Sequence, residues 1–203
     1  LGATMASSPS ERRPVIKVCH LITGLGTGGA ERGLAKLVLE TDSLQIRHSV
    51  ISLTNRGRYG EMFEQHNIPV YALNLGKNPG RFVWAALRLR EIMRHISPDI
   101  VHGWMYHGNL AAWLAARLLP NRPPVVWKIC QCLNQIKAEK WSTRLVILLG
   151  RYLSNGVNSI VYNSYLASSH HQNLGFSQVR TRVIVNGFRL PDWTELVESR
   201  RFL

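Results

Sequence analysis

The segment 15–39 constrains the fold more than any other part of the chain. It begins with an apolar run, 15–22, that is long enough for one buried strand, and it continues into a loop rich in glycine. From Ala30 onward the apolar residues recur at the spacing of a helix. A strand, a glycine loop and a helix form the first half of a βαβ unit, in which backbone N–H groups and the positive end of the helix face one point. The segment therefore predicts a cradle for a phosphate or another anion.

The loop matches the dinucleotide-binding pattern G-x-G-x-x-G at Gly24, Gly26 and Gly29. A dinucleotide site also needs an acidic residue at the end of the second strand, which binds the ribose. The predicted second strand is followed instead by Arg56 and Arg58. These arginines suit the 2′-phosphate of NADP, so an NADP-binding module remains one alternative. A contact to a nucleotide-sugar or sugar phosphate is the second, and a glycine turn without a ligand is the third.

Glu31 lies in the first turn of the predicted helix. A carboxylate there stabilises the helix dipole, but it competes with a pyrophosphate placed directly on the helix end. We predict that the ligand-binding loop consists of Gly26, Gly28, Gly29 and Glu31.

Composition and charge limit the class of protein. Lysine and arginine number 25 against 12 acidic residues, which gives a net charge of +13, and hydrophobic residues make up 45% of the chain. Such a chain can bury a core, and its field attracts phosphorylated substrates, anionic lipid or nucleic acid. The three cysteines, two of them in a C-x-C pair, predict neither a disulfide framework nor a metal site, and they indicate a reducing cytoplasm.

The chain alternates between apolar runs and segments with helical periodicity. We predict strands at 15–22, 46–53, 70–73, 99–104, 125–129, 159–162 and 183–185, and helices from residue 30 and at 58–67, 81–96, 110–119, 143–153 and 165–174. Because the strands are continuous apolar runs, they favour a parallel sheet that is covered on both faces. The fold class is therefore α/β, with a Rossmann-like open parallel sheet and helices on both faces.

Other features carry weaker expectations. The amphipathic helix 81–96, rich in arginine, either faces the core with a solvated basic back or lies on a membrane surface. Trp84, Trp113, Trp127 and Trp141 are expected to be packing residues, and the pair His170-His171 is expected on the surface. The segment 1–14 has no apolar region of a signal peptide, and no run reaches the length of a membrane span.

Ligands of open α/β sheets bind beyond the carboxyl ends of the strands. The glycine loop is expected at this rim with residues that follow the later strands, which are His107, Asn109, Lys128, Asn163, Ser164 and Asn186. His107 is expected in the loop 105–109, either as a base or sugar-hydroxyl contact or as a histidine that merely caps a helix. A glycine cradle, a histidine, a lysine and several amides suit a polar ligand with hydroxyls and phosphate.

Three stretches, LITGLGTGGAER, PDIVHGWMYHGNLAAWLAARL and SIVYNS…HHQNLGF…RVIVNGF, resemble family 4 glycosyltransferases over about residues 15–190. Members of that family are retaining enzymes with the two-domain GT-B fold, which move a sugar from a nucleotide-sugar to an acceptor hydroxyl on a lipid or a growing polysaccharide. The resemblance implies that no metal or other cofactor takes part. It also implies that Gly28 and Gly29 face the donor phosphate or the acceptor, that His107 lies near the transferred sugar, and that Asn186-Gly187 forms a turn that opens the linker to a second domain.

The chain departs from the family pattern at three places. A Trp-Gly-Ile-Arg run is replaced here by the residues 127–130, which moves a basic contact to Lys128, and Arg189 stands where an acid is usual. We expect that the second domain of the family, with its paired glutamates, is missing from this chain. We therefore expect a flexible tail at 1–14, the N-terminal glycosyltransferase domain at 15–187 and the start of a linker at 188–203, in a chain that is inactive alone. The expected partners are a nucleotide-sugar, a lipid-linked or polysaccharide acceptor and the inner face of an anionic membrane, but no nucleic acid. The alternatives are an NADP-binding module and a basic membrane-docking domain.

Overall fold

The computed structural model describes residues 14–43, 45–76 and 81–187, which fold around one seven-stranded sheet in the order β3-β2-β1-β4-β5-β6-β7. All neighbouring strands pair in parallel. The strands are β1 (Ile16–Ile22), β2 (Ile46–Ser52), β3 (Val70–Ala72), β4 (Ile100–Trp104), β5 (Val125–Ile129), β6 (Ser159–Tyr162) and β7 (Thr181–Val183). The helices are α1 (Gly29–Thr41), α2 (Gly57–Gln65), α3 (Arg81–Ile96), α4 (Met105–Arg117), α5 (Trp141–Leu153) and α6 (Tyr165–Asn173), with single turns at Ile136–Ala138 and Ser154–Gly156.

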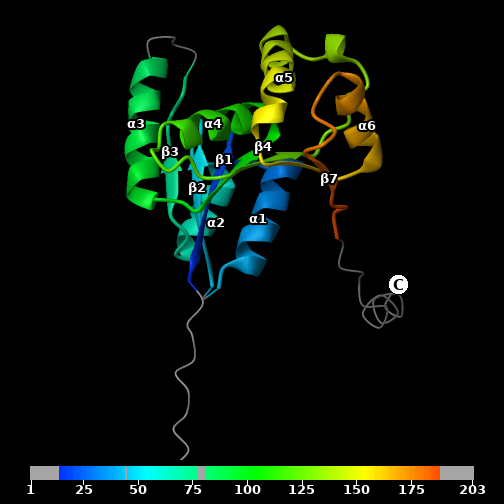
Figure 1. The fold of residues 1–203 in the computed structure, drawn as a ribbon. Coiled ribbons are helices and arrows are strands. Elements are labelled where there is room, and N and C mark those ends of the chain that lie inside the picture. Colours follow the sequence, from blue (N-terminus) through cyan, green and yellow to red (C-terminus); the bar gives the residue numbers. More distant parts are fainter. Residues whose placement is uncertain (1–13, 44, 77–80, 188–203) are drawn as a thin grey trace, which may run out of the picture.

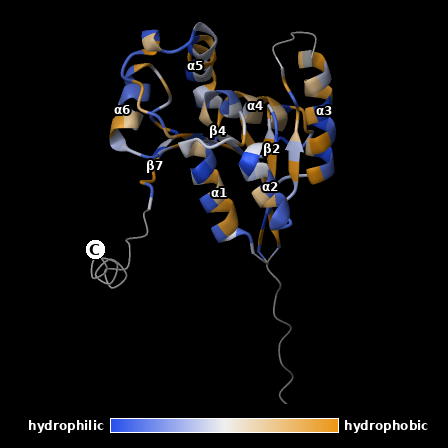
Figure 2. Cartoon of the chain, turned by 180° about the vertical axis from the view of Figure 1, so that it is seen from behind, coloured by the Kyte–Doolittle hydropathy of each residue, from blue (hydrophilic) through white to orange (hydrophobic). Residues whose placement is uncertain are grey.

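Helices cover both faces of the sheet, as the sequence predicts. In Figure 1 α1 and α2 lie in the lower part of the molecule, α4 and α5 in the upper part and α3 at the left, and Figure 2 shows the same arrangement from behind. The smaller core, under α1 and α2, includes Leu34 and Phe63, and the larger core, under α3 and α4, includes Met93 and Trp127. The α/β class and the Rossmann-like sheet are confirmed.

The order of the strands reverses at β1. The chain first moves outward from β1 to β2 and β3, and it then returns to place β4 on the other side of β1. Ile22 and Trp104, the last residues of β1 and β4, are direct neighbours in the register. Connections that leave in opposite directions open a crevice at such a point, where ligands of open sheets bind.

Most predicted elements lie within two residues of their observed bounds, and α3, β5 and β6 have the bounds that the sequence predicts. Two predictions are wrong near the site. The predicted loop 105–109 is the start of α4, because Met105 adopts a left-handed conformation (φ +60°) that turns the chain from strand to helix at once. The last strand is β7, two residues earlier than predicted, and residues 186–187 do not form the predicted turn. The predicted tail 1–14, apart from its last residue, and the predicted linker 188–203 fall outside the described residues.

Three side chains were assigned the wrong environment. His171 is fully buried rather than on the surface, because α6 packs it between Tyr106 and Tyr162. Its Nδ1 donates to the carbonyl of Ala167 (2.7 Å), so its Nε2 accepts from the Tyr106 hydroxyl (2.9 Å). Trp84 and Trp141 do not pack in the core, since they are 54% and 76% exposed.

Candidate functional site

The glycine loop after β1 is held in place by one buried side chain and by hydrogen bonds from the segment that follows β2. Leu25 is fully buried in the smaller core, which anchors the middle of the loop. The backbone N–H and the hydroxyl of Thr54, in the connection after β2, both donate to the carbonyl of Thr23 at 2.9 and 2.8 Å. The N–H of Tyr59 donates to the carbonyl of Leu25 at 3.1 Å. The loop is therefore a built feature of the fold.

The outer side of the loop is open. Gly26, Gly28 and Gly29 are exposed, and a Cβ placed on Gly26 or Gly29 would meet no atom within 4 Å. Packing within this domain therefore does not require glycine at these two positions. Helix α1 begins at Gly29 with Gly28 as its N-cap, and no side chain caps it. The first N–H groups of α1 are thus available to an anion.

Glu31 lies at this helix end, as the sequence predicts. Its carboxylate folds back beside Gly28, where an added Cβ would collide with it. A phosphate at the end of α1 has to share the position with this negative charge, whereas a sugar hydroxyl can donate to it. An open helix end beside a carboxylate therefore suits a ligand that has both a phosphate and hydroxyl groups.

The first turn of α4 lies directly against the end of β1. A Cβ on Gly108 would meet the carbonyl oxygen of Leu21 at 2.5 Å and the Cα of Ile22 at 3.2 Å. His107 belongs to this turn and therefore lies next to the strand that leads into the glycine loop. Its side chain is half-buried, and burial lowers its pKa. The ring is therefore neutral near pH 7, with one nitrogen free to accept a proton or a hydrogen bond.

Three predicted rim residues have structural contacts. Asn109 is only 3% exposed, so it lies beneath the rim, where its Nδ2 donates to the carbonyl of Lys128 (3.4 Å). The Nδ2 of Asn163 donates to the carbonyl of Cys130 (3.1 Å), which ties the ends of β5 and β6 together. The hydroxyl of Ser164 accepts the N–H of Ala167 (3.1 Å) and so caps α6.

Lys128 borders the start of α4 through its carbonyl, which accepts from Asn109, and Asn186 lies in the segment after β7. The neighbours of Lys128 along β5, Trp127 and Ile129, belong to the larger core, so the pleat directs Lys128 to the α1 face. Burial lowers its pKa. Asn186 is exposed in the segment after β7, and Lys36 on α1 donates its Nζ to the carbonyl of Gly187 (3.0 Å). The structure thus places Gly108, the neighbour of His107, against the end of β1, which leads into the glycine loop, and it places the segment around Asn186 beside a later turn of α1.

The match of a family model decides the identity of this fold. The model described as Glycosyltransferase Family 4 matches residues 27–190, most of the chain. This chain belongs to glycosyltransferase family 4. The matched region includes the end of the glycine loop and every predicted rim residue. The alternatives of an NADP-binding module and of a docking domain without enzymatic function are not favoured.

Solved structures of GT-B proteins share the fold of this family 4 domain. The Anabaena protein Alr3699/HepE in complex with UDP superposes with a TM-score of 0.69 at 17% identity, over 92% of this chain and 50% of that one. A lipopolysaccharide outer core galactosyltransferase, WaaB, gives 0.61 at 13% identity, over 85% of this chain and 46% of that one. A UDP-N-acetylglucosamine 2-epimerase gives 0.59 at 16% identity, over 91% and 55%. The chain spans about half the length of these proteins, and the search of curated proteins finds no match.

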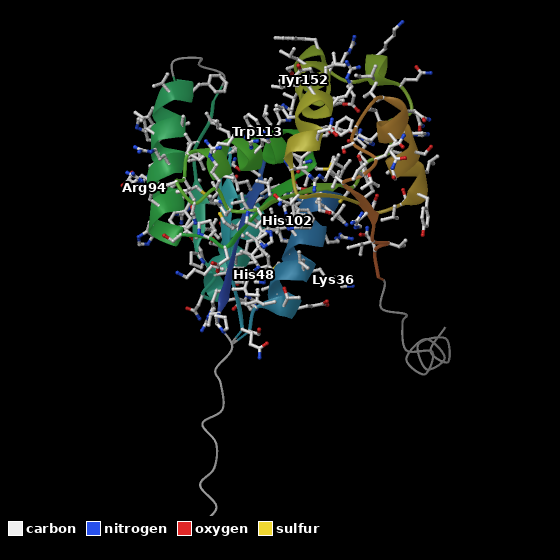
Figure 3. All side chains as sticks on the ribbon, in the orientation of Figure 1. Lys36, His48, Arg94, His102, Trp113 and Tyr152 are labelled. Atoms are coloured by element: carbon white, nitrogen blue, oxygen red, sulfur yellow. The ribbon has the colours of Figure 1, made fainter. Side chains whose placement is uncertain are left out.

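A buried histidine network under the site escaped the sequence analysis. His20 on β1 and His102 on β4 pair in the sheet register, and His48 on β2 stacks on His20 with ring centroids 5.1 Å apart. The indole N–H of Trp104 donates to Nδ1 of His20 (3.2 Å), whose Nε2 then donates to Nδ1 of His48 (3.0 Å). Figure 3 labels His48 and His102 on the strands behind α1. The sequence does contain a sign of this network, because each of three apolar strands includes a histidine.

The network ends on α1. Nε2 of His48 donates to the hydroxyl of Thr41 (2.9 Å), which donates to the carbonyl of Leu37 (2.6 Å). The family 4 domain thereby links the α1 face of β1, β2 and β4 to the last turn of the helix that starts at the glycine loop. Within the described part of the chain, no group of three or more histidine, cysteine or acidic residues is arranged to hold a metal ion. The same residues include no helix long and apolar enough to cross a bilayer.

Proposed function

We propose that this domain is the acceptor-side half of a retaining hexosyltransferase, which moves a sugar from a nucleotide-sugar to an acceptor hydroxyl. The observation that supports the proposal is the contact of Gly108, the neighbour of His107, with the end of β1, the strand that leads into the glycine loop and the open end of α1. Family membership and the UDP and UDP-glucose complexes of the HepE protein support a nucleotide-sugar as the donor.

The residues of the site take the following roles in this proposal. The N–H groups at Gly28 and Gly29 contact the donor phosphate or the acceptor, and Glu31 accepts from a hydroxyl. Neutral His107 contacts the transferred sugar. The departing phosphate is stabilised by the end of α1 and by basic groups of the other half, an electrostatic role of the oxyanion-hole type. We further propose that the reaction needs no metal or other cofactor.

The net charge of +13 supports an anionic, lipid-linked or polysaccharide precursor as the acceptor and the cytoplasmic face of a membrane as the place of reaction. A positive field of this size raises the local concentration of anionic substrates and surfaces. It carries no information about which sugar is moved.

The test uses a full-length protein that contains these 203 residues, with labelled UDP-sugars and a lipid and polysaccharide extract. We expect His107→Ala to lower kcat by at least about 100-fold, in the range for loss of a positioned polar catalytic contact. His95→Ala, at an exposed histidine near the end of α3, is the matched control and should keep the wild-type rate. An unchanged kcat/KM for His107→Ala would refute the role of this residue.

The isolated chain provides a second test. Because the nucleotide-gripping half is proposed to be a separate domain, calorimetry should detect only weak binding of UDP-glucose to the 203 residues. Tight, saturable binding to this chain alone would contradict its assignment to the acceptor side.

A further inference from the structure

Helix α5 is apolar on two opposite sides. One side packs against the fold through Ile147, which is fully buried, and Gly150, which lies against Phe176. The other side is a solvent-facing stripe. It consists of Trp141, Leu145, Leu148, Leu149 and Tyr152, whose exposed fractions are 76%, 61%, 43%, 43% and 81%.

The spacing makes this stripe continuous. Trp141, Leu145, Leu148 and Tyr152 follow one another at intervals of four, three and four residues, so they lie in one row along the helix. The row is about 16 Å long at 1.5 Å per residue. A soluble surface helix normally has charged residues on this side, and an exposed apolar patch of this extent marks an interaction site.

A second apolar patch lies on α3. Phe82, Val83, Trp84 and Leu87 are 61%, 71%, 54% and 62% exposed, although they belong to the first two turns of a helix whose later turns bury Leu89 and Met93. Helices α3 and α5 rise on either side of α4 on the same side of the molecule, with their starts at the top of Figure 1. Figure 3 places Tyr152 and Trp113 on α5 and α4 in this region. Both helices pack on the same face of the sheet, since Leu89 and Met93 of α3 and Ile147 of α5 belong to the larger core.

The segment that contains the stripe is rich in basic residues. The segment 137–153 contains Lys137, Lys140, Arg144 and Arg151 but only one acidic residue, Glu139. The carboxylate of Glu139 accepts a hydrogen bond from Nε2 of Gln131 at 2.6 Å. On α3, Arg90 and Arg94 add to this charge.

We propose that the α5 stripe and the exposed start of α3 form a docking surface for an anionic lipid bilayer. Basic side chains beside apolar ones match an interface of anionic headgroups and acyl chains, into which an amphipathic helix sinks by about 5–10 Å. The aromatic residues at the two ends of the stripe, Trp141 and Tyr152, are of the types that concentrate at membrane interfaces. Because α5 already packs on α4, the helix docks without having to fold.

Charge complementarity selects the bilayer over a second copy of this chain. Pairing two α5 stripes brings two basic segments together, and each copy carries a net charge of +13. Like charges at an interface oppose association. Gly187, the last described residue, lies beside α1 on the other face of the sheet, since Lys36 donates to its carbonyl.

The inference rests on the proposed function in one respect, because it assumes that the acceptor is lipid-linked and reaches the site from the bilayer. Helices α3 and α5 follow strands β3 and β5 and begin near the carboxyl edge of the sheet, where the first turn of α4 carries His107. A bilayer on this surface therefore places lipid-linked acceptors near the candidate site. Docking itself needs no catalysis, so it is tested on the 203-residue chain.

The experiment is flotation with vesicles of phosphatidylcholine alone or mixed with phosphatidylglycerol, at low and at high NaCl. We expect the wild type to float with the mixed vesicles and at least about tenfold less with neutral ones, with a partial loss in salt. The double variant Leu145→Asp/Leu149→Asp should lose at least tenfold of its binding. The charge-matched control Leu37→Asp/Val179→Asp changes two exposed apolar residues away from the stripe and should bind as the wild type does.

The depth to which the two patches enter the bilayer is measured separately with brominated lipids. Quenching of tryptophan fluorescence by these lipids should fall in Trp141→Phe and in Trp84→Phe. Absence of flotation, equal binding by the stripe variant and its control, or a dimer that the stripe variant alone disrupts would overturn the inference. None of these outcomes affects the transferase assay with a water-soluble acceptor, and loss of that activity would leave the docking result intact.

Discussion

Individual hydrogen bonds fix the protonation state of the buried histidines. An indole N–H can only donate, so Trp104 forces Nδ1 of His20 to be an acceptor, and each ring of the chain down to Thr41 then carries one proton. Burial lowers the pKa of His20 and His48 and lowers that of His102 to about 3. The nearby Lys128 also lowers the pKa of His102, whereas Asp42 acts in the opposite sense on His48.

The domain should lose stability in mild acid. A folded-state pKa below the unfolded value of 6.5 means that the unfolded chain binds more protons as the pH falls. The stabilisation from neutral histidines is complete above pH 6.5 and declines below it, toward pH 3 for His102, by about 1.4 kcal/mol per pH unit for each histidine. Urea unfolding at a series of pH values measures this decline.

The variant His102→Gln tests the origin of this pH dependence. It should flatten the decline by about 1.4 kcal/mol per pH unit, because one titrating group is removed. A wild-type stability that is constant between pH 7.5 and 5 would contradict the prediction.

The Tyr106 hydroxyl should contribute to stability through His171. Tyr106→Phe leaves a buried acceptor, Nε2 of His171, without its donor, and this costs about 1–3 kcal/mol in the free energy of unfolding. Tyr152→Phe, at an 81% exposed position, is the control and should change it by less than about 0.5 kcal/mol. Chemical denaturation of both variants at pH 7.5 compares them, and equal midpoints would be the contrary result.

At the scale of elements, the contact of α4 with the sheet depends on two glycines. A Cβ on Gly103 would meet the Cα of Asn109 at 2.5 Å, and one on Gly108 would meet the carbonyl of Leu21. Backbone atoms cannot move aside as the end of a flexible side chain can. The helix is therefore held at backbone contact distance from β4 and β1, and this contact sets the position of His107.

Alanine substitutions should separate packing glycines from glycines of the open loop. Gly108→Ala forces α4 away from β1 and should destabilise the domain by about 3 kcal/mol or more, at the upper end of overpacking costs. Gly26→Ala, with open space around its Cβ, should change stability by less than about 0.5 kcal/mol. Thermal unfolding of both variants measures the difference, and a Gly108→Ala protein as stable as the wild type would show that α4 is not so constrained.

The sequence predicted the elements better than it predicted the site. Apolar runs and helical periodicity are local properties, so they located α3, β5 and β6 at their observed bounds. The early start of α4 depends on the left-handed Met105, a residue type that gives no sign of such a conformation. Burial of Asn109 and His171 depends on partners far along the chain, which a pattern of neighbours does not reveal.

The exposed tryptophans show the same limit. Trp84 and Trp141 were assigned to the interior because large aromatic residues usually pack there. In α5 both sides of the helix are apolar, so periodicity alone does not tell which side meets the fold.

For the whole molecule, net charge should dominate the response to salt. Among the described residues three ion pairs form, all at the surface, so screening them removes little stability. The charge of +13 opposes compaction by self-repulsion, which salt weakens. Raising NaCl from about 20 to about 300 mM should therefore raise Tm by roughly 2–4 °C, equivalent to about 1 kcal/mol.

Differential scanning fluorimetry with NaCl measures this shift. Sodium chloride is used because sulfate strengthens burial by a separate effect. A Tm that falls with NaCl would mean that attractive charge pairs outweigh the repulsion.

The two margins of the sheet have a practical consequence for handling the protein. Both outermost strands, β3 and β7, are only three residues long, whereas the central strands β1 and β2 have seven. An edge strand this short has few unpaired backbone N–H and C=O groups with which a strand of another molecule could pair. Concentrated samples should therefore form amorphous aggregates through the exposed apolar side chains of their helices, and mild detergent should reverse this aggregation. They should not form fibrils.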